Sequence, residues 1–300
     1  MGTATTFLAP IDPRPRCDVS IAVLTHNPGP LLERQIRAVL AQKTDRTLEM
    51  LVVDSGSQNG AREMLARHPA VRVLSPQPGP FNFGLARDFA FENARGDVVV
   101  SLSQDAIPAR DDWIECLLRP LADPAVAASC GRSVPDPERG YPQFPWEENG
   151  LFYFTREMKR FASRYGKGLS NANSAIRRGV WAGLRFGEQS IGEDFRFQIK
   201  LQDAGWRIAF PDDAPALHHH TYTLASLLKR CRNEGLGLRE MGCPYALSDL
   251  LCDLASPHKY AVWVRELLRG RLTSLAALGF PLLRPLAVYA GSRFGRRFLP

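Results

Sequence analysis

Short apolar runs alternate with amphipathic ones over the first 110 residues, and this alternation constrains the fold more than any other feature of the sequence. Residues 18–25 and 48–54 are rich in β-formers, whereas residues 31–42 between them carry apolar side chains at helical spacing. Two strands joined by a helix predict a βαβ unit and therefore a parallel sheet. The pattern continues with expected strands at 71–74 and 97–103 and an expected helix at 84–94.

The middle of the chain has a different composition. Residues 135–168 are rich in proline, glycine and aromatic side chains, which predicts loops with one short helix and suits an active-site cover. Helical periodicity returns at 193–204 and from 222 to about 239, with a strand expected at 206–210. The expected fold class is therefore α/β, with a mostly parallel central sheet flanked by helices.

Length and composition fit a globular protein. The 300 residues are 45% hydrophobic and 23% charged, enough for one large core or two modest ones. We expect an N-terminal extension at 1–17, an α/β domain at 18–240 and a basic helical C-terminal region at 241–300. The six cysteines include no C-x-x-C pair and no secretory signal peptide opens the sequence, so reduced thiols in a cytosolic setting are expected.

The positive charge of the chain lies in its C-terminal tail. Residues 258–300 hold eight basic residues against one acid, Glu266, so the remainder is formally neutral although the whole chain carries +7. The most apolar stretch, residues 272–290, is interrupted by two prolines and Arg284, which argues against a transmembrane helix and favours a segment at an anionic membrane surface. The alternative is a basic helical pair packed on the domain. Nucleic acid is not an expected partner, because no recognition module accompanies these charges.

Several enzyme classes lack their motifs in this sequence. There is no G-x-G-x-x-G after the first strand, no G-x-x-x-x-G-K-[ST] and no G-x-S-x-G. Dinucleotide-binding, P-loop and nucleophile-elbow enzymes are therefore disfavoured.

Three acidic residues recur where strands should end or loops begin. Asp54 and Asp105 follow apolar runs, and Asp194 stands in Gly-Glu-Asp before an expected helix. Each could be an N-cap or turn residue, because aspartate commonly accepts hydrogen bonds from backbone N–H groups there. Three such acids on successive junctions favour ligand chemistry at the carboxyl edge of the sheet.

The neighbourhoods of these acids suit different roles. Asp54, followed by small residues, suits hydrogen bonds from a base or ribose. Asp105 suits a hard divalent cation. Asp194 lies beside Glu193 at a helix start, where it could act as a general base.

Other polar side chains extend this picture. His218 and His220 share one side of an extended chain and could complete a metal site or contact phosphate, with a solvated loop as the alternative. Arg87 suits diphosphate oxygens, although it could equally be an ordinary helix-surface arginine. Asn171 and Asn173 could bind sugar hydroxyls, and turn formation explains the same composition.

Together these motifs resemble the family 2 glycosyltransferases, which have the Rossmann-like GT-A fold, and more narrowly their bacterial rhamnosyltransferase-like branch. The resemblance extends over about residues 18 to 240. Besides the His218 to Leu224 run, the matching segments are Ser-Ile-Ala-Val-Leu-Thr-His-Asn (20–27), Leu-Val-Val-Asp-Ser-Gly-Ser (51–57), Phe-Asn-Phe-Gly-Leu-Ala-Arg-Asp (81–88), Ser-Gln-Asp-Ala (103–106) and Gly-Glu-Asp (192–194).

The resemblance implies a role for each candidate residue. The nucleotide sugar would be held by Thr25, Asn27, Asp54, Arg87, Gln104 and Asp105. The acceptor or the donor sugar would contact Asn171, Asn173 and Glu193. Asp105, with His218 or His220, would bind Mg²⁺ or Mn²⁺, and Asp194 would be the catalytic base. The usual D-x-D motif begins here with Ser103, and this Gln-Asp-Ala form is typical of the rhamnosyltransferase-like branch.

The function implied is an inverting transfer of rhamnose from dTDP-rhamnose to a hydroxyl of a cell-envelope glycan or lipid-linked acceptor. A UDP- or GDP-linked hexose is the alternative donor, and a non-catalytic nucleotide-sugar-binding scaffold is the alternative class of protein. With its basic tail, such an enzyme is expected to be cytoplasmic and peripheral at the inner face of the cytoplasmic membrane.

Overall fold

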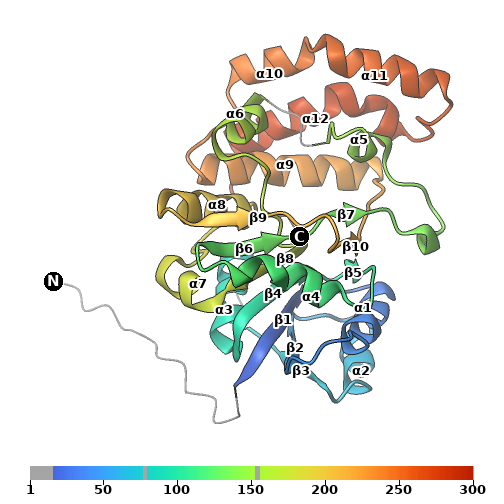
Figure 1. Ribbon diagram of the computed structural model, residues 1–300. Coiled ribbons are helices and arrows are strands. Elements are labelled where there is room, and N and C mark those ends of the chain that lie inside the picture. Colours follow the sequence, from blue (N-terminus) through green and yellow to red (C-terminus); the bar gives the residue numbers. More distant parts are fainter. Residues whose placement is uncertain (1–15, 77–79, 153–155, 300) are drawn as a thin grey trace.

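The computed structural model describes residues 16–76, 80–152 and 156–299, and a seven-stranded sheet lies at its centre (Figure 1). The order across the sheet is β3-β2-β1-β4-β8-β6-β9. The strands are β1 (Cys17–Thr25), β2 (Leu48–Asp54), β3 (Val71–Leu74), β4 (Gly96–Ser103), β6 (Val126–Cys130), β8 (Asn173–Arg177) and β9 (Arg207–Ala209). The first four strands run parallel, whereas β8 is antiparallel to both of its neighbours. The predicted mostly parallel sheet is confirmed, and residues 1–15 of the expected extension lie outside the described residues.

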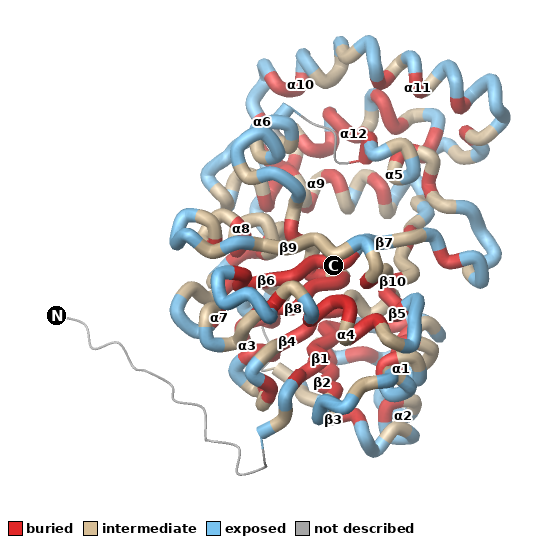
Figure 2. Tube along the Cα trace, in the orientation of Figure 1, coloured by how far each residue is buried: buried red, intermediate tan, exposed pale blue. Residues whose placement is uncertain are grey.

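β1 separates two hydrophobic cores. Val19, Ile21 and Val23 point into one core, whereas Ala22 and Leu24 point into the other, because successive side chains of a strand alternate between its faces. Figure 2 shows the central strands coloured as buried over most of their length. Burial of both faces explains why this strand is a continuous apolar run in the sequence.

Helices cover both faces of the sheet. The first core is closed by α1 (Leu31–Leu40), α2 (Ala61–Ala66) and α4 (Trp113–Leu118), and the second by α3 (Phe83–Asn93), α7 (Arg178–Leu184) and α8 (Glu193–Asp203). The helices expected at 31–42, 84–94 and 193–204 are confirmed to within two residues at each end. The helices α2, α4 and α7 were not predicted.

A second, small sheet brings two distant parts of the chain together. Its three strands are β5 (Ile107–Pro108), β10 (Ala216–Leu217) and β7 (Ser133–Val134), with β10 in the middle. Leu217 pairs with Ile107, so the residues just before β5 lie beside those just after β10. This pairing sets the position of Asp105 relative to the three histidines.

The segment 135–168 contains more helix than the single short one expected. The structure has a 3-10 helix at Pro137–Arg139 and two α-helices, α5 (Pro145–Glu148) and α6 (Arg156–Tyr165). Phe144, Trp146 and Phe152 are buried in a third core. These three aromatic side chains therefore anchor the segment in a core of the protein.

The third core lies between the C-terminal helices. These are α9 (Leu224–Glu240), α10 (Leu247–Leu254), α11 (Pro257–Leu268) and α12 (Leu275–Phe294). A Cβ atom at Gly235 would collide with the backbone of α12, and one at Gly291 with the backbone of α9, so these glycines allow the two helices to approach closely. The expected boundary between the α/β domain and the C-terminal region, at 240/241, falls between α9 and α10. Both helices contribute side chains to the same core, so packing continues across this boundary.

The prolines of the tail do not interrupt its helix. α12 runs from Leu275 to Phe294 with Pro281 and Pro285 inside it. A proline has no N–H to donate to the carbonyl four residues earlier, which for Pro281 is that of Ala277. The indole N–H of Trp146 donates to that carbonyl at 2.8 Å, so a side chain of α5 replaces the missing helical hydrogen bond.

Among the described residues, α12 is the one helix whose length and apolar composition would let it cross a membrane. Half of the apolar stretch of α12 is buried in the protein, and the core helices of soluble proteins can be equally long and apolar.

The hydrogen bond to Ala277 predicts a measurable stability difference. Trp146→Phe keeps a ring against Phe280, whose centroid is 4.7 Å from that of Trp146, but removes the donor and leaves a buried carbonyl unpaired. We expect a loss of about 1–3 kcal/mol in the free energy of unfolding, measured with urea. In a Pro281→Ala background the helix regains its own N–H, so the same substitution should cost less. An equal cost in both backgrounds would assign the loss to the smaller ring instead.

Candidate active site

The carboxyl ends of β1, β2 and β4 meet at one edge of the sheet and carry residues that the sequence singled out. Thr25 pairs in register with Asp54. Gln104, just after β4, accepts hydrogen bonds at Oε1 from Thr25 Oγ1 (2.7 Å) and from the N–H of His26 (3.0 Å). Gln104 therefore ties the end of β4 to the end of β1.

Asp54 and Asn27 shape the loops at this edge. The buried Asp54 carboxylate accepts from the N–H (3.1 Å) and hydroxyl (2.6 Å) of Ser57 and from Arg62 Nε (3.1 Å). Asn27, with φ at 45°, donates its N–H to Ser57 Oγ at 2.8 Å. Both residues thus have turn-forming contacts, and with Thr25 they lie outside the wall of the cavity described below.

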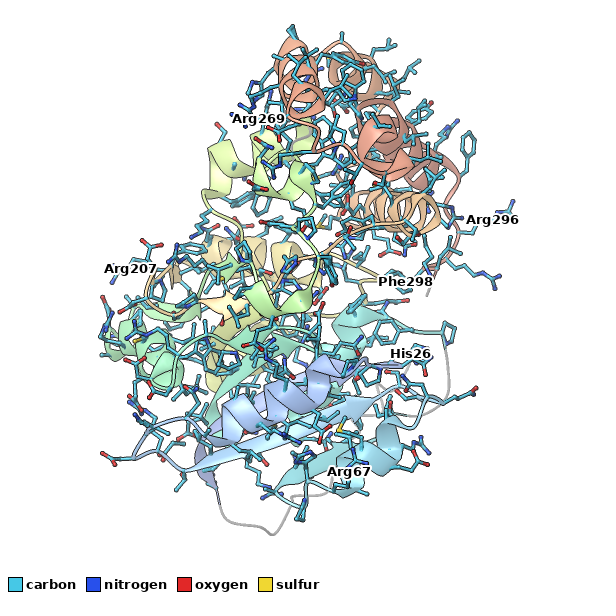
Figure 3. All side chains as sticks on the ribbon, turned by 90° about the vertical axis from the view of Figure 1, so that its right-hand side faces the viewer. His26, Arg67, Arg207, Arg269, Arg296 and Phe298 are labelled. Carbon is cyan, nitrogen blue, oxygen red and sulfur yellow. The ribbon has the colours of Figure 1, made fainter. Side chains whose placement is uncertain are left out.

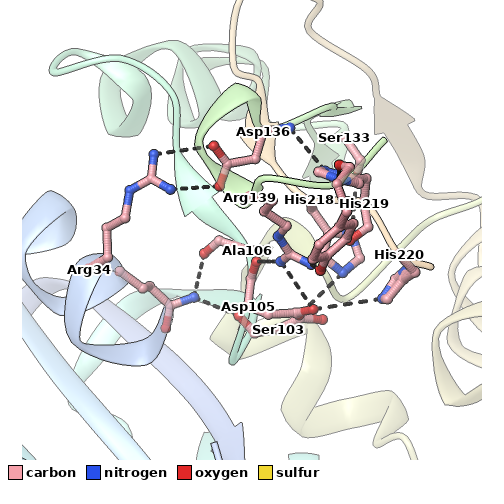
Figure 4. Close-up of polar contacts among 12 residues, drawn as sticks. Arg34, Ser103, Asp105, Ala106, Ser133, Asp136, Arg139, His218, His219 and His220 are labelled. Atoms are coloured by element: carbon pink, nitrogen blue, oxygen red, sulfur yellow. Dashed lines mark hydrogen bonds and ion pairs between the residues drawn. The ribbon is translucent and has the colours of Figure 1, made fainter. Parts of the chain in front are cut away.

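Asp105 lies between two histidines (Figure 4). Its Oδ1 is 3.3 Å from His218 Nε2, and its Oδ2 is 3.7 Å from His220 Nε2. One potential ligand atom from each of the three side chains lies within 4.8 Å of the others. The structure therefore brings together the three residues expected at a metal site.

Because side chains alternate in direction after β10, His218 and His220 point to the same side of the chain. The N–H of His218 donates to the carbonyl of Val134 at 2.9 Å, which continues the small sheet. His219 points the other way, where its Nδ1 accepts from the N–H of Asp136 (3.0 Å) and its Nε2 lies 3.2 Å from the carbonyl of Tyr141. The outer two histidines are left facing Asp105, as the extended-chain pattern predicted.

Arg139 also contacts Asp105, although the sequence did not single it out. Its Nη2 donates to the backbone carbonyl of Asp105 at 2.8 Å and lies 3.4 Å from Oδ2. The side chain is 4% exposed, and its Nε finds no hydrogen-bond partner in the described parts of the chain. Nothing in the proline-rich sequence around Arg139 distinguishes it from a solvated loop arginine.

These contacts keep Asp105 ionised. Burial alone would raise the pKa of the Asp105 carboxyl. The hydrogen bond and charge of His218, with the charges of His220 and Arg139, outweigh burial and hold that pKa below its ordinary value. A carboxylate is the form that binds a cation.

A cavity of about 420 Å³ extends from Asp105, His218 and His220 to the region around Asp194 and to the C-terminal helices. This volume is within the range of small-molecule sites. Its polar wall residues include Arg87, Asp105, Asn171, Glu193, Asp194, His218 and His220, with Arg230, Glu234 and Arg284 from the C-terminal helices. The sequence did not predict the contribution of α9 and α12.

Asp194 lies at the start of α8, where Gly192 has φ at 79° and turns the chain into the helix. Its Oδ2 accepts from the N–H of Asn171 (3.3 Å) and its Oδ1 from the N–H of Phe195 (2.9 Å). These two hydrogen bonds fix the carboxylate at the cavity wall.

The neighbouring Glu193 is paired instead of free. Its Oε1 accepts from Asn171 Nδ2 at 3.0 Å and lies 3.4 Å from Arg87 Nε. Arg87 also donates to the carbonyl of Asn171 at 3.4 Å, and its buried Nη1 has no partner among the described residues. Arg87 is therefore a buried cavity residue and not a helix-surface arginine.

The pKa of Asp194 is displaced toward neutrality. Burial raises it, and the adjacent charge of Glu193 raises it further. The backbone hydrogen bonds and the charge of Arg87 oppose this shift only in part, so the pKa of Asp194 is raised to about 7. A carboxylate with this pKa can accept a proton near neutral pH.

Two polar side chains, those of Asn173 and Asp88, act as scaffold and do not line the cavity. Asn173 is buried outside the cavity wall, where it accepts from Trp113 Nε1 (3.1 Å) and donates to the carbonyl of Ala214 (2.9 Å). Asp88, which closes segment 81–88, accepts from Trp181 Nε1 (2.8 Å) and from the N–H of Phe186 (2.9 Å). The hydrogen bond from Phe186 to Asp88 fixes the start of the segment that leads from α7 to Asp194.

Comparison with known proteins identifies the family. A family model described as Glycosyl transferase family 2 matches residues 20–184. The chain belongs to this family. The glycosyltransferase is 26% identical over 226 residues to O-antigen chain rhamnosyltransferase RfbN of Salmonella typhimurium, which covers 73% of this chain and 71% of the relative. It is 27% identical over 225 residues to O-antigen chain rhamnosyltransferase WbaN of Salmonella anatum, covering 72% and 71%.

Solved structures share the fold of the glycosyltransferase. A mannosyltransferase from Pyrobaculum calidifontis, in complex with GDP-Man and Mn²⁺, matches 95% of this chain and 88% of its own with a TM-score of 0.60 at 20% identity. Glucosyl-3-phosphoglycerate synthase from Mycobacterium tuberculosis, in complex with Mn²⁺, UDP-Glc and phosphoglyceric acid, matches 76% of this chain and 81% of its own with a TM-score of 0.56 at 19% identity. The predicted GT-A fold is confirmed.

The pairing of Glu193 with Asp194 predicts the effect of removing one charge. Glu193→Gln should lower the pKa of Asp194 by about one unit, because it removes a neighbouring negative charge and leaves Arg87 uncompensated. The measurement is a ¹³C NMR titration of aspartate carboxyls, with Asp194→Asn to assign the signal. Glu188→Gln, at an exposed position five residues earlier, is the matched control and should leave the titration unchanged. An unshifted Asp194 signal in the Glu193 variant would contradict this account.

Proposed function

We propose that the glycosyltransferase transfers rhamnose from dTDP-rhamnose, with inversion at the anomeric carbon, to a hydroxyl of a cell-envelope glycan or lipid-linked acceptor. One observation carries the reaction class: a single cavity holds the carboxylate of Asp105 with two histidines and a second carboxylate, that of Asp194, at the start of α8. The choice of rhamnose rests on the two curated relatives, which are named as O-antigen chain rhamnosyltransferases.

Asp105, His218 and His220 are the proposed ligands of a divalent cation, Mg²⁺ or Mn²⁺. One carboxylate oxygen and two imidazole nitrogens suit Mn²⁺ better, because Mg²⁺ prefers oxygen ligands and more of its own water. His220 Nε2 and Asp105 Oδ2 face each other at 3.7 Å, too far for a hydrogen bond, and a cation would satisfy both atoms. When bound, the cation would neutralise charge on the departing diphosphate.

Two buried arginines complete the proposed diphosphate site. Arg139 lies against Asp105 and has a free Nε, while Arg87 has a free Nη1 among the described residues. A buried guanidinium with an unpaired N–H is costly unless a ligand accepts from it. Phosphate oxygens are suitable acceptors for such donors.

Asp194 is the proposed base. The acceptor hydroxyl would attack the anomeric carbon as the bond from that carbon to the diphosphate oxygen breaks, and the hydroxyl proton would pass to Asp194. The leaving diphosphate would carry away the bonding electrons. Because the pKa of Asp194 is raised to about 7, the rate should rise with pH through that value as the carboxylate form appears.

The remaining predicted residues have supporting roles in this proposal. The nucleotide would lie over the sheet edge formed by Thr25, Asn27, Asp54 and Gln104. Thr25 donates a hydrogen bond to Gln104 there, and Ser57 links Asn27 to Asp54, so these contacts set the shape of that edge. Asn171 and Glu193 line the cavity next to Asp194 and would contact the transferred sugar or the acceptor.

Removing the proposed base should separate turnover from binding. Asp194→Asn is expected to slow the release of dTDP from dTDP-rhamnose, with water as the acceptor, by at least about 100-fold. The rise in melting temperature with dTDP-rhamnose and Mn²⁺ should persist, because a bound donor stabilises the folded protein. Asp203→Asn, at an exposed position in the last turn of the same helix, should retain wild-type turnover. Turnover above a tenth of wild type in the Asp194 variant would exclude it as the base.

The same melting experiment tests the donor. Selective stabilisation by dTDP-rhamnose over UDP-glucose and GDP-mannose supports rhamnosyl transfer. Preference for a UDP- or GDP-sugar would keep the transferase and replace the sugar.

We propose further that α12 rests on an anionic membrane surface. Four exposed leucines recur at helical spacing on one face of this helix: Leu275, Leu278, Leu282 and Leu286. On the opposite face, Phe280 lies in the third core and Arg284 and Val288 line the cavity. An exposed apolar row on a helix that is otherwise packed against protein suits burial in a lipid headgroup region.

Positive charge flanks the leucine row. Arg269 and Arg271 precede α12, Arg293 lies in its last turn, and no acid follows Glu266. Figure 3 shows Arg269 and Arg296 projecting outward from the C-terminal half of the protein. Arginines beside an apolar face match the charge of an anionic bilayer, which would hold the cavity near lipid-linked acceptors at the inner face of the cytoplasmic membrane.

Surface substitutions test the membrane proposal better than deletion, because α12 also packs against α9. Leu282→Asp with Leu286→Asp should weaken sedimentation with phosphatidylglycerol vesicles about tenfold or more, since it removes apolar contact and adds negative charge. Leu40→Asp, at a similarly exposed leucine (49% against 52% and 48%) at the end of the distant helix α1, is the matched control. Unchanged sedimentation of the double variant would reject α12 as the contact surface.

A further inference from the structure

Glu147 lies behind His220, on the side of the ring away from Asp105. Its Oε1 is 3.2 Å from His220 Nδ1, while His220 Nε2 faces Asp105 at 3.7 Å. An ionised carboxylate can only accept a hydrogen bond, so Nδ1 must carry the proton. In the neutral ring the lone pair is then on Nε2, the atom that faces Asp105.

Glu147 is held in place by several contacts. Its Oε1 accepts from the hydroxyl of Tyr222 at 2.9 Å, and its Oε2 accepts from the backbone N–H of His220 at 3.2 Å. The N–H of Phe144 donates to the carbonyl of His220 at 3.0 Å. The chain around α5 thus binds residue 220 at its N–H, its carbonyl and its ring, and the Glu147 side chain is 10% exposed.

His218 has a weaker counterpart to this arrangement. Its Nδ1 lies 3.5 Å from the hydroxyl of Ser133, which is neutral and belongs to an exposed residue. A charge-assisted hydrogen bond orients a ring more strongly than a long contact with a hydroxyl. Of the two histidines, His220 is therefore the one whose ring has a carboxylate as its hydrogen-bond partner at Nδ1.

The position of Glu147 depends in turn on α12. Trp146, the preceding residue, stacks on Phe280 with 14° between the ring planes and donates to the carbonyl of Ala277. These contacts fix α5 against a helix of the C-terminal region. No sequence motif marks Glu147, and it is not one of the three proposed metal ligands. Its contacts with His220 and Tyr222 are therefore unexplained by the roles assigned above.

We propose that Glu147 is a positioning residue that fixes the tautomer and orientation of His220 for binding a divalent cation. This inference rests on the proposed cation site at Asp105, His218 and His220. A carboxylate behind a metal-binding histidine holds the ring and makes its free nitrogen more basic, and loss of such a partner typically weakens metal binding about 10- to 100-fold.

The test is Mn²⁺ binding to the full chain without donor, measured as loss of the free-ion signal in electron paramagnetic resonance. Glu147→Ala should raise the Mn²⁺ dissociation constant about 10- to 100-fold. Glu147→Gln should be intermediate, because its amide oxygen can still accept from Nδ1. Glu148→Ala is the matched control on the same helix, since that side chain is 46% exposed and pairs with Arg271 on the surface.

A second readout separates positioning from general damage. Electron spin echo modulation from ¹⁴N should show two histidine ligands on Mn²⁺ in the wild type and one in Glu147→Ala, with the melting temperature recorded for each variant. Affinity within twofold of wild type with both nitrogens retained would overturn the role of Glu147. If Mn²⁺ fails to bind the wild type, the cation site itself is wrong, and the role of Glu147 is overturned with it. Binding to the wild type that is lost in Asp105→Asn establishes the site independently.

Discussion

The parallel pairing of β1 with β2 on one side and β4 on the other is the interaction on which the rest of the site depends. Parallel strands end at the same edge of a sheet, so Thr25, Asp54 and the Gln104–Asp105 turn meet there. The short pairing of β10 with β5 then adds the histidines to this edge. Loops and C-terminal helices complete the cavity without extending the main sheet.

The sequence pattern predicts the first four strands of the main sheet, because burial leaves a run or an alternation of apolar residues in each of them. The strands at 48–54 and 71–74 have the predicted bounds. Residues 50–53 of the first are buried on both faces of the sheet, which requires a continuous apolar run that the sequence shows directly. The small strands β5, β7 and β10 have two residues each and carry no such signal. The continuity of α12 through its two prolines could not be predicted, because the hydrogen bond that replaces the one lost at Pro281 comes from Trp146, 131 residues before Ala277 in the chain.

The candidate site was predictable only in part, for a related reason. Asp105, Asp194 and the alternating histidines could be identified because strand ends and side-chain alternation are local features. Arg139 and Glu147 contact the site across 34 and 73 residues, from a segment without periodicity. Asn173 shows the converse, because its polar side chain satisfies backbone groups in the interior. Residue type alone does not distinguish a ligand-facing amide from one that supports the core.

Under the proposed membrane contact, the two faces of α12 would limit which acceptors can reach the cavity. Arg284 and Val288 line the cavity on one face, and the leucine row lies on the opposite face, so one helix diameter, roughly 10 Å, separates them. A surface contacted by the leucines would be that close to the cavity wall. The enzyme would then accept substrates whose reactive hydroxyl lies only a few sugar units from that surface. Long chains whose growing end extends far from the surface would not reach the cavity.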